Sequence, residues 1–156
     1  MYKSLILNYQ EFDSVDQMTE SDRELLNRAA GATTSAYAPY SGFSVGAALR
    51  LKDGTVVWGS NQENAAFPSG LCAERTALFA ASAQRPEQRD YQALAIVGRN
   101  ADGQLCEAAP CGACRQVMLE YERLQGHPMR VIMQLGGGRV RVVGSVKELL
   151  PFGFEL

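Results

Sequence analysis

The chain of 156 residues lacks the segments that mark several specialised classes of protein. It has no long hydrophobic run, and the apolar stretch near its start, residues 5–7, is too short for a signal peptide or a membrane span. It also has no basic run, because its 15 lysines and arginines are scattered and its net charge is -2. We therefore expect no membrane and no nucleic acid among its partners, and a small, neutral or weakly charged ligand instead.

Histidine and cysteine are scarce, with one histidine and four cysteines. His127 stands between Gly126 and Pro128 with no other candidate ligand beside it, so we expect a surface loop residue. Without a secretory signal, four cysteines are better explained as metal ligands than as disulfides. The expected compartment is cytoplasmic.

What the chain does have is the composition of an ordinary globular protein, with 46% hydrophobic and 21% charged residues. This length and composition predict a single domain over residues 1–156. Residues 1–18 form an N-terminal extension without an assigned role. Within it, residues 3–9 alternate weakly between polar and apolar, which is typical of an edge strand or an ordered arm.

Periodicity and turn signals predict helices alternating with strands, in an α/β arrangement. A five-stranded mixed sheet with helices packed on its faces accommodates this order. Gly136–Gly138 is not followed by a helix with a lysine, so it predicts a turn and not a phosphate loop. The predicted elements are a helix opened by a Ser21–Glu24 capping box and carrying Leu25, Leu26, Ala29, Ala30 and Ala36, strands at 43–49 and 55–59 joined by an Asp53–Gly54 hairpin, a helix from Cys72, a strand at 93–97, a helix from about Cys111, strands at 130–133 and 139–143, and a short helix at 146–150.

Two cysteine-bearing segments, residues 71–75 and 110–116, dominate the sequence. They contribute three thiols, at Cys72, Cys111 and Cys114. Three protein ligands with one open position are typical of a catalytic zinc site, whereas structural sites have four protein ligands. Cys106 is the rival fourth ligand of a structural site, although a small buried or strand-edge thiol is the simpler interpretation.

The charge of such a centre needs compensation. Three thiolates and one zinc ion sum to about -1, which weakens the acidification of water that catalysis requires. Both segments enter predicted helices, whose N-termini carry partial positive charge. Arg75 follows Cys72 by three residues and is predicted to hydrogen-bond the sulfurs, with Arg115 a weaker candidate. Glu74 is placed to move protons near neutral pH, so its pKa should be raised.

These residues carry a resemblance to a known family. The chain resembles the small zinc-dependent cytidine deaminases from about residue 37 to residue 154. The motifs follow one another in the order of that family. They are Ala38-Pro39-Tyr40-Ser41-x-Phe43-x-Val45-Gly46-Ala47-Ala48, Asn61-x-Glu63-Asn64-Ala65, Cys72-Ala73-Glu74-Arg75-Thr76-Ala77, Pro110-Cys111-x-x-Cys114-Arg115-Gln116 and Leu149-Leu150-Pro151.

The resemblance implies a three-layer α-β-α fold and the hydrolytic deamination of cytidine and deoxycytidine to uridine and deoxyuridine, a reaction of pyrimidine salvage. It implies one Zn²⁺ per subunit, held by Cys72, Cys111 and Cys114. Glu74 would protonate N3 of the base and then the departing ammonia, while activated water attacks C4.

The same resemblance implies the substrate contacts and the assembly. Asn61 and Glu63 would bind the ribose hydroxyls, the Ala73 N–H would meet the base carbonyl, and Phe43 would flank the nucleoside. A phenylalanine from the C-terminal tail of a neighbouring subunit would stack on the base, either Phe154 or, less favoured, Phe152. The assembly would be a homotetramer with sites completed between subunits.

Two other functions stay open. An aminohydrolase of a nucleoside antibiotic such as blasticidin S shares the zinc and glutamate segments, and the Asn61–Glu63 motif only moderately favours cytidine. A structural zinc module would leave Glu74 idle. Deaminases of guanine, deoxycytidylate or transfer RNA usually have histidine as the first ligand, where this chain has Cys72.

Overall fold

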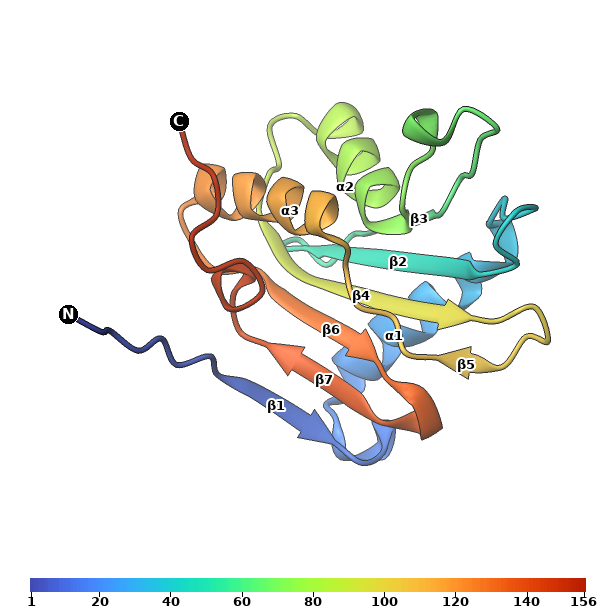
Figure 1. Ribbon diagram of the computed structural model, residues 1–156, viewed down its shortest axis with the longest axis horizontal. Helices are drawn as coiled ribbons and strands as arrows, with labels where there is room; N and C mark the ends of the chain where they lie inside the picture. The colour runs from blue at the N-terminus through green and yellow to red at the C-terminus, as the bar shows by residue number, and fades with distance from the viewer.

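The computed structural model describes all residues from 1 to 156. Seven strands, three α-helices and several 3-10 turns follow one another along the chain (Figure 1). In order, they are β1 (Tyr9–Phe12), η1 (Val15–Gln17), α1 (Glu20–Ala32), η2 (Thr33–Ser35), β2 (Ser44–Leu51), β3 (Val56–Ser60), η3 (Phe67–Ser69), α2 (Ala73–Gln84), β4 (Tyr91–Arg99), β5 (Leu105–Cys106), α3 (Gly112–Gln125), β6 (Arg130–Gln134), η4 (Gly136–Gly138), β7 (Val140–Val143) and η5 (Val146–Glu148).

The strands form one mixed sheet in the order β1-β7-β6-β4-β2-β3, and β5 pairs with the end of β4. Only β4 and β6 run parallel, with α3 as the crossover between them, and the other pairs are antiparallel. A parallel pair needs a crossover of about a dozen residues, which is the length that a helix supplies. This connection sets the start of α3 beside the central strand β4.

Helices cover both faces of the sheet, with α2 and α3 on one face and α1 on the other (Figure 1). Each face therefore has its own apolar cluster, one under α2 and α3 and one under α1. Two glycines let the helices approach the strands. A Cβ on Gly59 of β3 would lie 2.5 Å from the Ala77 nitrogen, and one on Gly46 of β2 would lie 2.0 Å from the Ala29 carbonyl oxygen.

The predicted three-layer arrangement is confirmed, and all five predicted strands are present, but the sheet has seven strands. The two additional strands are short. β5 has two residues and pairs with the end of β4 through the turn at residues 100–104, and a run of two residues is too short for a periodic pattern to predict a strand. β1 lies at residues 9–12, later than the predicted 3–9, because its partner β7 fixes where it pairs.

The predicted capping box was wrong. α1 begins at Glu20, and its N-cap is Thr19, whose hydroxyl accepts a hydrogen bond from the Asp22 N–H at 3.2 Å. Ser21 instead accepts a hydrogen bond from the Arg50 side chain. The helix also ends at Ala32, before Ala36, where the chain changes to a 3-10 turn.

The predicted hairpin at Asp53–Gly54 is confirmed. Gly54 has φ +85°, and the Asp53 carboxylate accepts a hydrogen bond from the Thr55 N–H at 2.9 Å. The predicted short helix at 146–150 is a 3-10 turn that ends at Glu148. No helix of the chain has the length and apolar character needed to cross a bilayer.

A buried carboxylate ties α1 to the sheet. Asp22 accepts two hydrogen bonds from Arg130 of β6, at 2.8 and 3.1 Å, and one from Arg50 of β2 at 3.2 Å. Burial raises the pKa of Asp22, but the hydrogen bonds and positive charge of the two arginines outweigh it, so this pKa lies below its ordinary value. Folding therefore favours the ionised carboxylate.

We predict that Asp22→Asn lowers the free energy of unfolding at pH 7 by about 1–3 kcal/mol, because it leaves two guanidinium groups without their counter-charge. The folded-state pKa is depressed, so this contribution is fully present above the unfolded pKa of about 3.9 and is lost as the pH falls below it. Urea unfolding at pH 7 and pH 3 measures both effects. Glu20→Gln, an exposed change in the same helical turn, is the control. Equal destabilisation by the two changes at pH 7 would contradict the prediction.

Candidate metal centre and catalytic site

Two helix N-termini hold the predicted metal ligands. Cys72 is the N-cap residue of α2 and Cys111 is the N-cap residue of α3, both with extended backbone. Neither sulfur is used for capping, so both are free to bind another group. Cys114 lies in the first turn of α3 and is buried. The prediction that both segments sit where a loop enters a helix is confirmed.

The three sulfurs have the spacing of a metal centre. They lie within 4.8 Å of one another, and the Sγ atoms of Cys72 and Cys111 are 3.7 Å apart. Sulfurs about 2.3 Å from a zinc ion lie about 3.8 Å apart in a tetrahedral arrangement, so the cluster fits zinc. Cys106 is outside this cluster, on β5, with its thiol directed to the Gln104 carbonyl. The structure therefore does not form the alternative structural site with four thiolates.

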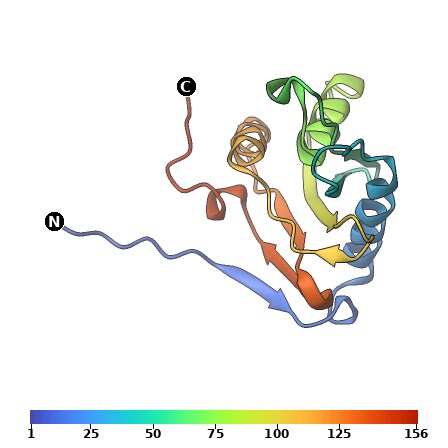
Figure 2. The same cartoon turned by 45° about the vertical axis from the view of Figure 1, so that its right-hand side comes forward.

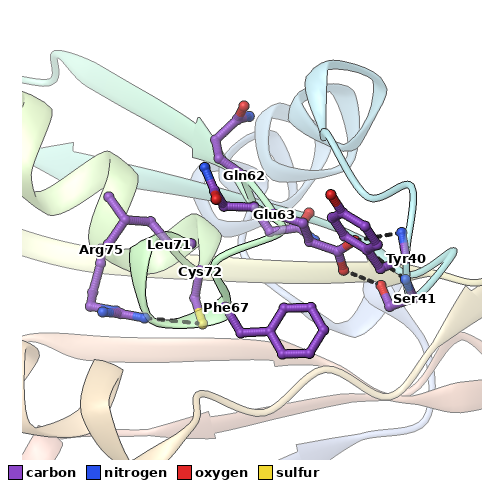
Figure 3. Close-up of a pocket in the computed structure, with 11 residues that line it drawn as sticks. Tyr40, Ser41, Gln62, Glu63, Phe67, Leu71, Cys72 and Arg75 are labelled. Atoms are coloured by element: carbon purple, nitrogen blue, oxygen red, sulfur yellow. Dashed lines mark hydrogen bonds between the residues drawn. The ribbon is translucent and has the colours of Figure 1, made fainter.

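Charge around the cluster favours a thiolate. Hydrogen bonds from the thiols of Cys114 and Cys111 and from Arg75 lower the pKa of Cys72 to about 5, although burial opposes them. The Nη2 atom of Arg75 donates to the Cys72 sulfur at 3.7 Å, which Figure 3 shows as a dashed line. Its Nε atom is buried without a hydrogen-bond partner. Arg75 thus presents its cationic group to the sulfurs, whereas Arg115 turns to the carbonyls of Pro110 and Leu149.

Glu74 lies beside this centre in the first turn of α2 and is only 3% exposed. Burial, followed by the negative charge of Cys72, raises the pKa of Glu74 to about 7. No arginine or lysine forms an ion pair with it. A buried carboxyl group in these surroundings can hold or release a proton at neutral pH.

An open cavity of about 490 Å³ lies directly in front of Cys72 and Arg75 (Figure 3). The loop that carries Asn61 and Glu63 forms its other wall. Gln62 fixes this loop to the metal segment, because its backbone N–H and carbonyl both bond to Leu71, at 2.8 and 2.9 Å. The structure thereby brings one predicted metal ligand, Cys72, and the Asn61–Glu63 motif to one cavity, and Cys111 and Cys114 adjoin it through the thiol cluster.

The Asn61 and Glu63 side chains are already bonded to backbone. The Asn61 amide accepts from the Val45 N–H at 2.7 Å and donates to the Phe43 carbonyl at 2.9 Å. The Glu63 carboxylate accepts from the Ser41 hydroxyl and from the backbone N–H groups of Tyr40 and Ser41, and these bonds lower its pKa. The two side chains therefore order the 40–45 segment at the cavity edge.

The other predicted substrate contacts are placed differently. Ala73 is buried at the start of α2, beside the centre. The Phe43 ring packs beneath Gly98, where an added Cβ would lie 2.7 Å from the ring, and it does not line the cavity. Phe154, 68% exposed, is also outside the cavity, on a tail that Gln116 of α3 holds by two hydrogen bonds. Phe152 is 97% exposed.

Sequence reasoning missed two aromatic residues that line the cavity, Tyr40 and Phe67. Their rings meet edge to face with centroids 6.0 Å apart, and both are exposed to solvent (Figure 3). The available signal was Phe67 itself, an aromatic residue beside Pro68 in an otherwise polar loop. An exposed aromatic pair at a cavity offers a flat apolar surface for a ring-containing ligand.

The helix-flanked mixed sheet and the thiol cluster define an α/β enzyme with a zinc centre. More specifically, the chain belongs to the cytidine and deoxycytidylate deaminase zinc-binding family, whose model matches residues 19–125. Zinc is accordingly the cofactor, and the three-cysteine cluster is positioned to hold it. The match begins after residue 18, so the N-terminal extension lies outside it.

Individual relatives agree with this assignment. A cytidine deaminase from Halalkalibacterium halodurans is 45% identical over 136 residues, which cover 85% of this chain and 94% of that protein. The crystal structure of cytidine deaminase from Burkholderia pseudomallei superposes with a TM-score of 0.74 at 44% identity, covering 88% of this chain and all of that one. That of cytidine deaminase from Mycobacterium tuberculosis gives a TM-score of 0.68 at 33% identity, with 89% and 100% coverage.

We predict that Arg75→Ala preserves the fold but weakens zinc binding by about 10- to 100-fold, because the cluster loses the cation that faces its sulfurs. Competition with a chromophoric chelator measures the affinity, and thermal unfolding followed by circular dichroism checks the fold. Arg85→Ala, at the other end of α2 and bonded to Asp53, is the control. Unchanged zinc affinity in Arg75→Ala would remove this residue from the centre.

Proposed function

We propose that the chain catalyses the hydrolytic deamination of cytidine and deoxycytidine to uridine and deoxyuridine, with release of ammonia, as a step of pyrimidine salvage. The observation that carries the proposal is the buried Glu74 carboxyl group next to the three-thiol cluster, whose Cys72 lines an open cavity of nucleoside size. The cytidine deaminases among its relatives support the same reaction.

Glu74 is the proposed proton carrier. Zinc held by Cys72, Cys111 and Cys114 would supply a Lewis acid that makes water a better nucleophile. Glu74 takes a proton from the attacking water and delivers it to N3 of the base as oxygen bonds to C4. It then takes the second proton of that oxygen and gives it to the amino group, which leaves as ammonia. A carboxyl group with a pKa near 7 suits both directions of transfer.

Glu63 and Asn61 are the proposed contacts to the ribose. Each has hydrogen-bonding capacity beyond the backbone bonds it makes, because a carboxylate accepts about four hydrogen bonds and an amide nitrogen donates two. The Ala73 N–H, at the positive end of α2, is the proposed donor to the base carbonyl. Phe43 is proposed to flank the nucleoside. Its ring does not line the cavity, so it would do so as part of the 40–45 segment, which the Asn61 side chain holds at the cavity edge.

We further propose a homotetramer whose sites are completed by neighbouring subunits. Phe154 is exposed and lies outside the cavity of its own chain, which fits a side chain that stacks on the base in another subunit. Phe152 stays the second choice. The cluster needs reduced cysteines, and a reducing, cytoplasmic compartment provides them.

The second candidate is an aminohydrolase of a cytosine nucleoside antibiotic such as blasticidin S. This candidate stays open because the side chains of Asn61 and Glu63, on the cavity wall opposite the metal centre, bond chiefly to backbone groups of the 40–45 segment. These side chains therefore do not restrict the cavity to a ribose.

We predict that Glu74→Gln lowers the rate of cytidine deamination by at least about 10²–10⁴-fold and keeps the zinc, since an amide cannot carry the proton. Loss of cytidine absorbance in the ultraviolet measures the rate, and atomic absorption measures zinc in both proteins. Blasticidin S is assayed beside cytidine and deoxycytidine. A zinc-loaded wild type that converts none of them would contradict the proposed function, and conversion of blasticidin S alone would establish the second candidate.

For the shared site, we predict that Phe154→Ala raises KM for cytidine about tenfold or more, because stacking of a base on an aromatic ring contributes about 1–3 kcal/mol. Phe152→Ala is the matched control on the same tail. Light scattering should give four times the 17.0 kDa mass of the chain. An active monomer would disprove the shared site, and an effect confined to Phe152→Ala would assign the stacking to that residue.

A further inference from the structure

The N-terminal extension forms an arm that leaves the body of the protein. Residues 1–8 run extended from β1; Asn8 is still bonded to Glu148 of η5, and the residues before it lead away from the body of the protein in both views (Figures 1 and 2). The arm is rich in apolar side chains that nothing covers, such as Leu5 at 58% and Ile6 at 80% exposed. Exposure of apolar side chains to water is unfavourable, and an isolated extended segment cannot bury its own side chains. A second surface is therefore needed to cover them.

The strand that continues the arm has a free edge. β1 is the outermost strand of the sheet, with β7 as its only neighbour. An unpaired strand edge is a template for pairing with a further strand. Residues 1–12 contain no proline and no bulge that would block such pairing.

One hydrogen bond fixes which backbone groups point to that edge. The Asn8 N–H donates to the Glu148 carboxylate at 2.9 Å, so it points inward, toward η5. Because alternate residues of a strand direct their N–H and carbonyl groups to opposite edges, the odd-numbered residues direct theirs outward. An added antiparallel strand must therefore bond through Leu7, Tyr9 and Glu11.

We propose that the arm and β1 pair with the same segment of a second copy of this chain, antiparallel and symmetric about Leu7. The two copies then form one continuous sheet across a two-fold axis. Odd-numbered residues of one copy meet odd-numbered residues of the other, as the outward groups require. The pairs across the axis are Leu7 with Leu7, Leu5 with Tyr9, Tyr2 with Phe12, Lys3 with Glu11, Ser4 with Gln10 and Ile6 with Asn8.

This register is favoured because it matches both charge and apolarity. It sets Lys3 opposite Glu11 and pairs apolar or aromatic side chains at three positions, with Ile6 opposite Asn8 as the exception, and such matched cross-strand pairs each stabilise a sheet. A centre one residue earlier would leave Lys3 opposite Tyr9. A centre one residue later would leave Glu11 opposite Leu5. A second copy is thus the occupant that the sequence of the arm itself specifies.

The Glu11 side chain is already fixed by a contact within its own chain. It bonds to Arg141 on β7, and the Arg141 guanidinium also lies over the Tyr9 ring, 5.3 Å from its centroid. The two β1 side chains that would face Lys3 and Leu5 of the second copy are therefore fixed on one side of the sheet. The proposal concerns residues outside the metal centre and does not depend on the proposed deamination.

Cysteine cross-linking of the full-length protein tests the register. Leu7→Cys sets two thiols opposite each other, with Cα atoms about 5.5 Å apart, which suits a disulfide. Ile6→Cys, the control, sets them about 8 Å apart on the offset diagonal, beyond the reach of a disulfide. Oxidised glutathione is added, and covalent dimer is followed on non-reducing gels, with the wild type giving the background of the native cysteines.

We expect Leu7→Cys to form dimer on the order of a hundredfold faster than Ile6→Cys, because pairing raises the effective concentration of the thiols to the millimolar range. Equal mixtures of Leu5→Cys and Tyr9→Cys should cross-link, and Leu5→Cys by itself should not. Equal rates for Leu7→Cys and Ile6→Cys, or no dimer from either, would overturn the proposal. Contacts through other surfaces would raise the rates of both variants alike, so the ratio of the two rates reports the register.

A change of charge tests the register independently. Lys3→Glu, added to Leu7→Cys, sets like charges opposite each other and should slow cross-linking several-fold. Ser4→Glu, which faces Gln10 in this register, is the control that places the same carboxylate on the neighbouring residue; it changes the net charge by -1 (0 to -1), whereas Lys3→Glu changes it by -2 (+1 to -1). Equal slowing by both changes would show that net charge, and not the Lys3–Glu11 pair, governs the contact, and would refute the register.

Discussion

The concentration of negative charge at one point is the constraint on which the rest of the structure depends. Three cysteine sulfurs lie within 4.8 Å of one another, and a carboxyl group is buried beside them. Charges this close repel strongly in a low-dielectric interior. Two helix N-termini, with their partial positive charge, and the guanidinium of Arg75, directed at Cys72, offset this repulsion. The same negative surroundings help keep the Glu74 proton bound near neutral pH.

Packing of the two helices against the sheet makes this arrangement possible. α2 lies so close to β3 that a Cβ on Gly59 would overlap its backbone, and α3 must cross from β4 to β6. These two restrictions bring the N-termini of α2 and α3 together. The Gln62–Leu71 backbone bonds then attach the cavity loop to the metal segment. The cavity is therefore a consequence of how the sheet and helices meet.

The metal centre was predictable because its residues lie in two short segments with characteristic spacing. Cysteine is rare, and a Cys-x-Glu and a Cys-x-x-Cys before helical patterns leave few alternatives. The five main strands were predictable for the same reason, since apolar runs and turn residues bound them. Glu74, too, was identified from its position, and its burial follows from the packing of α2.

Features that depend on distant partners were not predictable. Thr19 caps α1 in place of Ser21, whose hydroxyl bonds instead to Arg50 of β2. β5 was missed for another reason: it is joined to β4 by a short turn but has only two residues, too few for a strand pattern. Tyr40 and Phe67 meet across the cavity because two loops converge there, which no local pattern encodes.

Helix α3 connects the metal centre to the end of the chain. Its first turn carries Arg115, which bonds to the Pro110 carbonyl next to the Cys111 ligand and to the Leu149 carbonyl. The following residue, Gln116, bonds to both backbone groups of Phe154. A shift of the tail would therefore act directly on the loop that carries a metal ligand. If Phe154 serves another subunit, the tail that serves it and the loop that carries Cys111 are attached to the same helical turn of α3.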